Sequence, residues 1–156
     1  MLLKKNIKPL VFFVLLALFL DQITKLLAIN YLNPLQPPTE VIGSVLRLKL
    51  TFNPYGIFGI SFGPTELNHV LSAVGVILFI YIAFTLKDRV SLLVFGLLIG
   101  GAIGNALDRV RFGYVIDFID MGIGDLRWFT YNLADAFLTV GAIFLLAREV
   151  FFKKKL

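Results

Sequence analysis

The sequence predicts an all-α membrane protein, a four-helix transmembrane bundle with a small extracytoplasmic β-element and a second outer loop segment. Of its 156 residues, 58% are hydrophobic and only 16% are charged, which is too apolar for an ordinary soluble domain. Four apolar stretches each approach the roughly 20 residues that a helix needs to cross a bilayer. The lysines and arginines gather at the ends of these stretches.

We treat residues 1–156 as one integral membrane domain. Its predicted spans cover residues 9–29, 67–86, 90–107 and 132–152, and the extracytoplasmic segments cover residues 30–66 and 108–131. The first span follows a basic N-terminus, as in a signal peptide. No A-x-A-like cleavage site follows it, so we expect a retained helix.

The charges predict the orientation. Nine cations fall on one side of the membrane: Lys4, Lys5, Lys8, Lys87, Arg89, Arg148, Lys153, Lys154 and Lys155. Eight of the ten acids, all but Asp88 and Glu149, fall on the other side. Because lysine and arginine mark the cytoplasmic side, both termini are expected there and the acids are expected at the outer face.

The first outer segment contains a predicted strand. Residues 45–52 alternate strictly between leucine or phenylalanine and other side chains, which is the period of a strand. Asn53-Pro-Tyr-Gly is typical of a turn, and residues 57–62 are suited to return as a partner strand. A plain connecting hairpin explains the same pattern.

Five aspartates lie within 28 residues: Asp108, Asp117, Asp120, Asp125 and Asp135. An ionised side chain at membrane depth costs roughly 2.5 to 3.5 kcal/mol on insertion scales, so acids there indicate a functional site. Two such carboxylates suggest acid–base chemistry.

Asn105-x-x-Asp108 ends the third span and Asn132-x-x-Asp135 begins the fourth. Since these spans are antiparallel, the two polar patches finish at the same depth, where each amide can bond an acid. Asp117 has apolar neighbours and no local cation, which makes it the better partner for Asp135.

Each acid also has a simpler explanation. Asp135 suits the positive end of a helix dipole, and Asp108 has ionic partners available in Arg109 and Arg111. Asp21 and Lys25 are spaced i,i+4 and would neutralise each other.

Other features exclude classes of site. Gly96, Gly100 and Gly104 form a close-packing surface for another helix. With no cysteine and one histidine, His69, the chain is not expected to use a metal or other cofactor. The net charge of +5 does not indicate nucleic-acid binding, because the cations lie at helix ends.

The motifs resemble those of bacterial lipoprotein signal peptidases, the type II signal peptidases. The resemblance rests on five motifs in order: Asp21-Gln-Ile-Thr-Lys25, Asn53 with Phe58, Gly100-Gly-Ala-Ile-Gly-Asn105-Ala-Leu-Asp108-Arg109, Gly113 followed by Val-Ile-Asp117-Phe, and Tyr131-Asn132-Leu-Ala-Asp135. One departure is that Gly56 stands three residues after Asn53, whereas the family usually has two.

The resemblance implies an aspartic endopeptidase of the bacterial cytoplasmic membrane. Asp117 and Asp135 would be its catalytic pair, with Asn53, Asn105, Asp108, Arg109 and Asn132 as supporting or substrate-contacting residues and Asp21 as a structural one. The implied partners are membrane lipid and a prolipoprotein that carries a diacylglyceryl group on cysteine and is cut just before that cysteine.

Three alternatives remain from the residues themselves. A small proton or cation transporter would use the acids as a relay. Gly122-Ile-Gly-Asp125 matches the Gly-x-Gly-Asp pattern of another class of intramembrane protease, although no long apolar helix surrounds it. A structural scaffold would tolerate Asp-to-Asn changes at positions 117 and 135.

Overall fold

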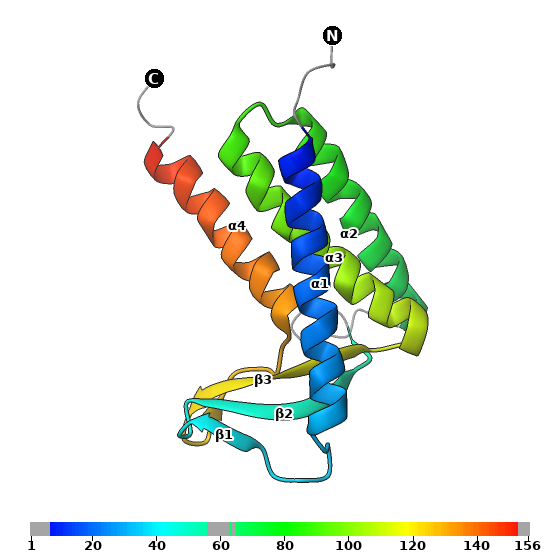
Figure 1. Cartoon of the computed structure of the whole chain (residues 1–156), viewed down its shortest axis with the longest axis vertical. Coiled ribbons are helices and arrows are strands. Elements are labelled where there is room, and N and C mark those ends of the chain that lie inside the picture. Colours follow the sequence, from blue (N-terminus) through cyan, green and yellow to red (C-terminus); the bar gives the residue numbers. More distant parts are fainter. Residues whose placement is uncertain (1–6, 56–62, 64, 153–156) are drawn as a thin grey trace.

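The computed structural model of the chain describes residues 7–55, 63 and 65–152. Within them lie four helices and a four-stranded antiparallel sheet (Figure 1). The helices are α1 (Lys8–Tyr31), α2 (Thr65–Thr85), α3 (Arg89–Phe112) and α4 (Leu133–Phe152), and the strands are β1 (Thr39–Ile42), β2 (Leu46–Asn53), β3 (Val115–Ile123) and β4 (Leu126–Arg127). The helices coincide with the four apolar stretches, and β2 with the alternating segment. The suggested partner strand at residues 57–62 lies outside the described residues.

Three of the helices are long and apolar enough to cross a membrane: Lys8–Tyr31, Glu66–Thr85 and Arg89–Phe112. In the described part of the chain, α4 does not meet the same criterion. It carries three charged side chains, Asp135, Arg148 and Glu149, within its 20 residues. The structure is therefore that of a mostly helical membrane protein with a small sheet.

The third helix is the centre of the bundle and is longer than predicted. Side-chain capping by Asp88, which accepts a 2.7 Å hydrogen bond from Ser91 N, starts α3. It ends at Gly113, whose φ of +80° is the left-handed conformation that favours glycine. The helix continues five residues beyond the predicted span, so Asp108 and Arg109 belong to it.

Small residues let α1 and α4 lie close to α3. The predicted close-packing surface of Gly96, Gly100 and Gly104 lies against α1. A Cβ atom added at Gly100 would lie 2.7 Å from Ala17 Cβ of α1, and one added at Gly101 would lie 2.9 Å from Ala134 O of α4. Neither distance is compatible with a real side chain. Close backbone approach is therefore built into both interfaces.

The second outer segment contains β3, an element that the sequence does not predict. Its pairing with β2 sets Thr51 opposite Asp117 and Asn53 opposite Val115. Val115, Ile116, Asp117 and Phe118 are all buried, so the strand is covered on both faces and shows no alternating pattern. The sheet packs on α1 through Ala28, Leu50, Ile116 and Phe118.

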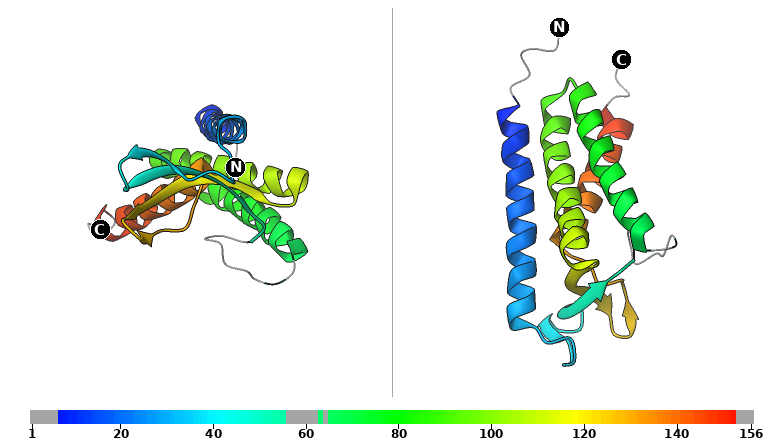
Figure 2. Two further views of the ribbon diagram at one scale, coloured as in Figure 1. Left: turned by 90° about the horizontal axis from the view of Figure 1, so that it is seen from below. Right: turned by 90° about the vertical axis from the view of Figure 1, so that its right-hand side faces the viewer.

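The sheet lies across one end of the helical bundle (Figure 2). The start of α1, the α2–α3 connection and the end of α4 all lie at the opposite end (Figure 1). The sheet-side end therefore gathers the last turns of α1 and α3, the first turn of α4, and β3.

Candidate active site

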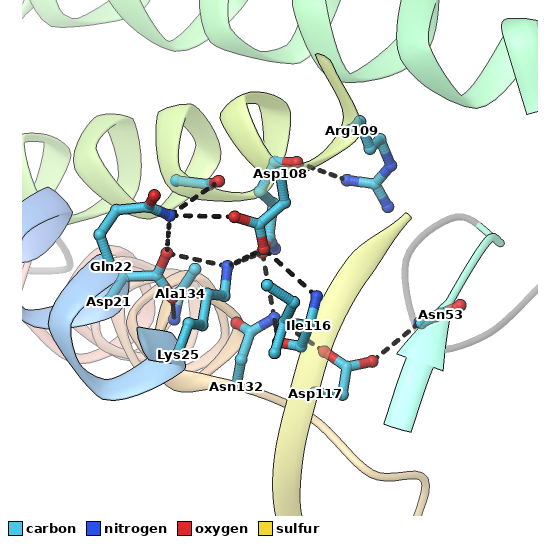
Figure 3. Close-up of polar contacts among 12 residues, drawn as sticks. Asp21, Gln22, Lys25, Asn53, Asp108, Arg109, Ile116, Asp117, Asn132 and Ala134 are labelled. Carbon is cyan, nitrogen blue, oxygen red and sulfur yellow. Dashed lines mark hydrogen bonds and ion pairs between the residues drawn. The ribbon is translucent and has the colours of Figure 1, made fainter. Parts of the chain in front are cut away.

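A buried lysine joins two acids from different helices at the sheet-side end. Lys25 Nζ lies 2.8 Å from Asp21 Oδ2 and 2.8 Å from Asp108 Oδ2, and the three side chains are at most 2% exposed. Figure 3 shows the ammonium between the two carboxylates. The i,i+4 pairing is as predicted. The simpler explanation of Asp108, an ion pair with Arg109 or Arg111, does not hold among the described residues, because close packing of α1 on α3 brings Lys25 to Asp108 instead.

The same two acids hold the neighbouring elements. Asp21 Oδ1 accepts a hydrogen bond of 3.0 Å from Ala134 N in the first turn of α4. Asp108 Oδ2 accepts one of 3.2 Å from Ile116 N on β3, and Asp108 Oδ1 accepts one of 3.1 Å from Gln22 Nε2. The cluster thus fixes the two elements that carry Asp135 and Asp117.

Lys25 also determines the orientation of the Asn105 amide. Lys25 Nζ donates to Asn105 Oδ1 at 2.9 Å, and Asn105 Nδ2 donates to Asp135 Oδ1 at 2.9 Å. Because an ammonium group can only donate, the amide oxygen must face Lys25 and the amide nitrogen must face Asp135. A buried charge on α1 therefore orients a donor toward a carboxylate on α4.

Asn132 is the residue that links the two predicted acids. Its Oδ1 accepts from Asp135 N at 2.9 Å, while Asp135 Oδ2 accepts from Asn132 N at 3.4 Å. This reciprocal arrangement caps the start of α4. Asp135 therefore stabilises the start of its helix, in line with its simpler explanation as an acid in the first turn. Asn132 Nδ2 donates to Asp117 Oδ1 at 2.8 Å and to Asn105 Oδ1 at 3.0 Å.

Asp117 is buried on β3, with 2% of its surface exposed. Besides Asn132, it accepts a 3.0 Å hydrogen bond from Asn53 Nδ2 at the end of β2 (Figure 3). Burial, and then the charge of Asp135, raise the pKa of Asp117 to about 7. Asp117 and Asp135 thus interact electrostatically and share Asn132 as a partner.

Arg109 is buried beside this network without an acid of its own. In the described part of the chain it forms no ion pair within 4 Å. Its Nη2 donates to Tyr55 O at 3.0 Å and its Nη1 to Asn105 O at 3.3 Å. A guanidinium cannot lose its proton here, so it contributes a fixed positive charge near two carboxylates.

A cavity of about 700 Å³ opens next to the network. Asn53, Asn105, Arg109 and Asp135 form part of its lining. Most of the rest is apolar and comes from three helices: Leu71, Gly75 and Phe79 of α2, Phe95, Leu98 and Ala102 of α3, and Leu138, Ala142 and Leu145 of α4. The site can accept a long apolar ligand whose polar part reaches the carboxylates.

Two of the five clustered aspartates lie outside this network. Asp120 forms ion pairs with Arg47 at 2.7 Å and Arg127 at 2.9 Å. Although burial raises the pKa of Asp120, hydrogen bonds from these arginines bring it below its ordinary value. Asp125 is exposed in the turn between β3 and β4, not in a long apolar helix. The alternative site at Asp125 therefore lacks the setting that it requires.

Two amide side chains of this region are not among the residues that the sequence singles out. Gln22 bonds Asp108, and Asn68 of α2 lines the cavity. Both are polar residues in apolar spans. The sequence does not indicate their contacts, because the residues that they meet are distant in the chain.

The chain matches the sequence model of a family described as Signal peptidase (SPase) II over residues 13–151. It is 35% identical over 148 residues to a lipoprotein signal peptidase of Syntrophus aciditrophicus (strain SB), covering 88% of this chain and 91% of that protein. The protein of the same name from Francisella tularensis subsp. novicida (strain U112) is 36% identical over 142 residues, covering 86% and 87%.

The fold is similar to that of solved bacterial membrane enzymes. One such structure, determined by the in meso method at 2.3 Å resolution, superposes with a TM-score of 0.79 and 28% sequence identity. The match covers 98% of this chain and 96% of the other. A second structure, at 1.9 Å resolution, gives a TM-score of 0.78.

Proposed function

This chain belongs to the signal peptidase II family, and we propose from this that Asp117 and Asp135 are the catalytic pair of an aspartic endopeptidase. The enzyme removes signal peptides from prolipoproteins. One observation carries the assignment of the pair: two carboxylates from β3 and α4 share Asn132, and one of them, Asp135, lines a largely apolar cavity of about 700 Å³.

The proposed mechanism follows from the electrostatics of the pair. Two carboxylates in a poorly solvated site do not both stay ionised, so one keeps a proton. The ionised member removes a proton from water as the water attacks the scissile carbonyl, and the protonated member donates a proton toward the carbonyl oxygen. The charge of Arg109 stabilises the negative charge that develops on that oxygen. No covalent intermediate with the enzyme forms.

The proposed substrate is a prolipoprotein whose cysteine carries a diacylglyceryl group, cut just before that cysteine. Each buried CH₂ of the acyl chains contributes roughly 0.8 kcal/mol to membrane anchoring, so the scissile bond is held at the bilayer surface. The apolar walls of the cavity suit such a ligand, and Asp135 lies at its polar part.

The proposed orientation places the sheet-side end outside the cytoplasm in the bacterial inner membrane. Its support is the distribution of cations, which favours the cytoplasmic side for the opposite end of the bundle. We propose that α4 is the fourth span. Asp135 lies in its first turn at the outer surface and Arg148 in its last part at the inner surface, so its charged residues avoid the centre of the bilayer.

The test is cleavage of a diacylglyceryl-modified lipobox peptide by purified protein in detergent or bilayers. Wild-type protein is expected to cleave it, while Asp117→Asn and Asp135→Asn are inactive but folded. Asp125→Asn, which changes an exposed acid in the same segment, is the matched control and keeps wild-type activity. Full activity of either of the first two variants would overturn the pair, and loss of activity in Asp125→Asn would favour the alternative protease site.

A further inference from the structure

We propose that Asn68 is a substrate-binding residue whose side-chain oxygen accepts a hydrogen bond from a backbone N–H of the peptide near the scissile bond. This inference rests on the proposed function. It concerns the α2 side of the cavity, whereas the carboxylates are carried by β3 and α4. Asn68 lines the cavity together with Asp135 and Arg109.

The carrying observation is an unsatisfied acceptor. Asn68 is 3% exposed, and its Oδ1 has no hydrogen-bond partner among the described residues. Buried side-chain polar atoms are in large majority hydrogen-bonded, so each exception needs an explanation. Asn68 lines a cavity with room for a ligand, and its buried oxygen gains a donor when a ligand displaces the atoms that cover it.

The orientation of the Asn68 amide is determined by its other contact. Asn68 Nδ2 donates to Pro54 O at 3.4 Å. A carbonyl oxygen can only accept and proline has no N–H, so the amide nitrogen faces Pro54. The amide oxygen is therefore the group left without a partner.

Neighbouring donors are already engaged. Ser72 Oγ donates to the backbone oxygen of Asn68 at 2.7 Å. Arg109 donates to Tyr55 O and Asn105 O. Neither of these cavity-lining side chains directs its donor to Asn68 Oδ1.

The substrate supplies donors of the required kind. For a water molecule to reach the scissile carbonyl, the peptide around it must be extended and not helical. Its backbone N–H groups then lose their intrachain partners, which is costly in an apolar cavity. An acceptor on the wall of that cavity gives one of these N–H groups a new hydrogen-bond partner. Because every peptide has backbone N–H groups, this contact does not depend on the side chains of the substrate.

The test is a double-mutant cycle in which the second change is made in the substrate. Lipobox peptides are synthesised with one backbone N–H replaced by an ester oxygen, at each of three positions on either side of the scissile bond, the scissile N–H itself left intact. Values of kcat/KM are measured for wild type, Asn68→Leu and Thr85→Ala. The leucine has a similar size and no acceptor. Thr85→Ala is the matched control, because Thr85 is an exposed α2 residue outside the cavity lining whose side chain donates to a backbone oxygen of its own helix.

At one position the ester is expected to lower kcat/KM of wild type about tenfold, as for one buried hydrogen bond. The same ester should lower kcat/KM of Asn68→Leu less than about twofold. Esters at the remaining positions should lower kcat/KM of both proteins equally. Thr85→Ala should behave as wild type does. Asn68→Asp, which keeps an acceptor oxygen and loses the donor to Pro54, should keep the ester effect.

The inference is overturned if no ester position distinguishes wild type from Asn68→Leu, or if Asn68→Asp loses the effect together with Asn68→Leu. The first result would mean that another group satisfies Oδ1, and the second that Asn68 acts only through its contact with Pro54. Either result leaves the proposed function intact as long as wild type cleaves the unmodified peptide and Asp117→Asn does not.

Discussion

Asn132 donates a 2.8 Å hydrogen bond from its side-chain nitrogen to Asp117 Oδ1, and the same residue caps the helix that carries Asp135. Asp117 on β3 and Asp135 on α4 are thereby both held by the side chain of Asn132. Asn132 therefore sets the relative position of the proposed catalytic pair together with the buried cluster that holds β3 and the start of α4.

Asn132→Ala is therefore expected to reduce kcat roughly 100-fold, because misplacement of a reacting group by about 1 Å has effects of that size. Loss of the cap should also cost about 1 kcal/mol of stability. The measurement is steady-state cleavage, with thermal melting to show that the variant is folded at the assay temperature. Asn30→Ala, an exposed asparagine that bonds only Leu26 O, is the control, and wild-type kcat in Asn132→Ala would contradict the assignment.

The rate of cleavage should fall on the alkaline side of neutrality. The pKa of Asp117 is about 7, raised by burial and by Asp135, so the pair holds a proton below that pH and loses it above. Without a proton the pair has no general acid. A pH profile of kcat measured from pH 5 to 9 is expected to decline above about pH 7, toward tenfold per pH unit. A flat profile to pH 9 would exclude this proton from the reaction.

The same carboxyl makes stability depend on pH. Its folded-state pKa of about 7 lies above the ordinary value of 3.8, so its contribution to stability is full below about pH 3.8 and is lost as the pH rises through 7. Relative to Asp117→Asn, wild type should lose up to roughly 4 kcal/mol between pH 4 and 8. Melting curves of both proteins across this range test the difference. Asp125→Asn should follow wild type.

Lys25→Met should be strongly destabilising, because it leaves Asp21 and Asp108 buried without their cation. Breaking a buried ion pair costs about 3 to 5 kcal/mol. The control is Arg148→Met, which removes the ion pair with Asp88 at the opposite end of the bundle, where the two side chains are 33% and 42% exposed. Because solvent screens both partners, that pair should contribute little to stability. Equal loss of melting temperature in the two variants would refute the comparison.

Gly104→Ala should destabilise the protein and lower its activity together. A Cβ atom there would meet the carboxylate of Asp21, which holds Lys25 and the first turn of α4. Gly75→Ala changes another glycine within a helix, at a position where a Cβ atom meets nothing within 4 Å. It should raise stability by up to about 1 kcal/mol. Thermal melting of both variants is the measurement, and tolerance of Gly104→Ala would mean that α1 is free to shift.

The features that depend on neighbours in the chain follow from the sequence alone. Apolar length predicts the four helices, alternation predicts β2, and i,i+4 spacing predicts the pair of Asp21 and Lys25. The choice of Asp117 and Asp135 as the catalytic pair also rests on their immediate surroundings. Asp117 has no cation nearby in the chain, and Asp135 lies one turn into a span.

Which distant groups meet depends on how the helices and the sheet pack together. Asp108 pairs with Lys25 and not with Arg109, since close packing on glycine brings α1 to it. β3 is not apparent in the sequence because both faces of its first four residues are buried, which removes alternation. The directions of the Asn105 and Asn68 amides depend on partners in other elements, because an amide group has no preferred direction until a donor or acceptor from elsewhere in the fold is placed beside it.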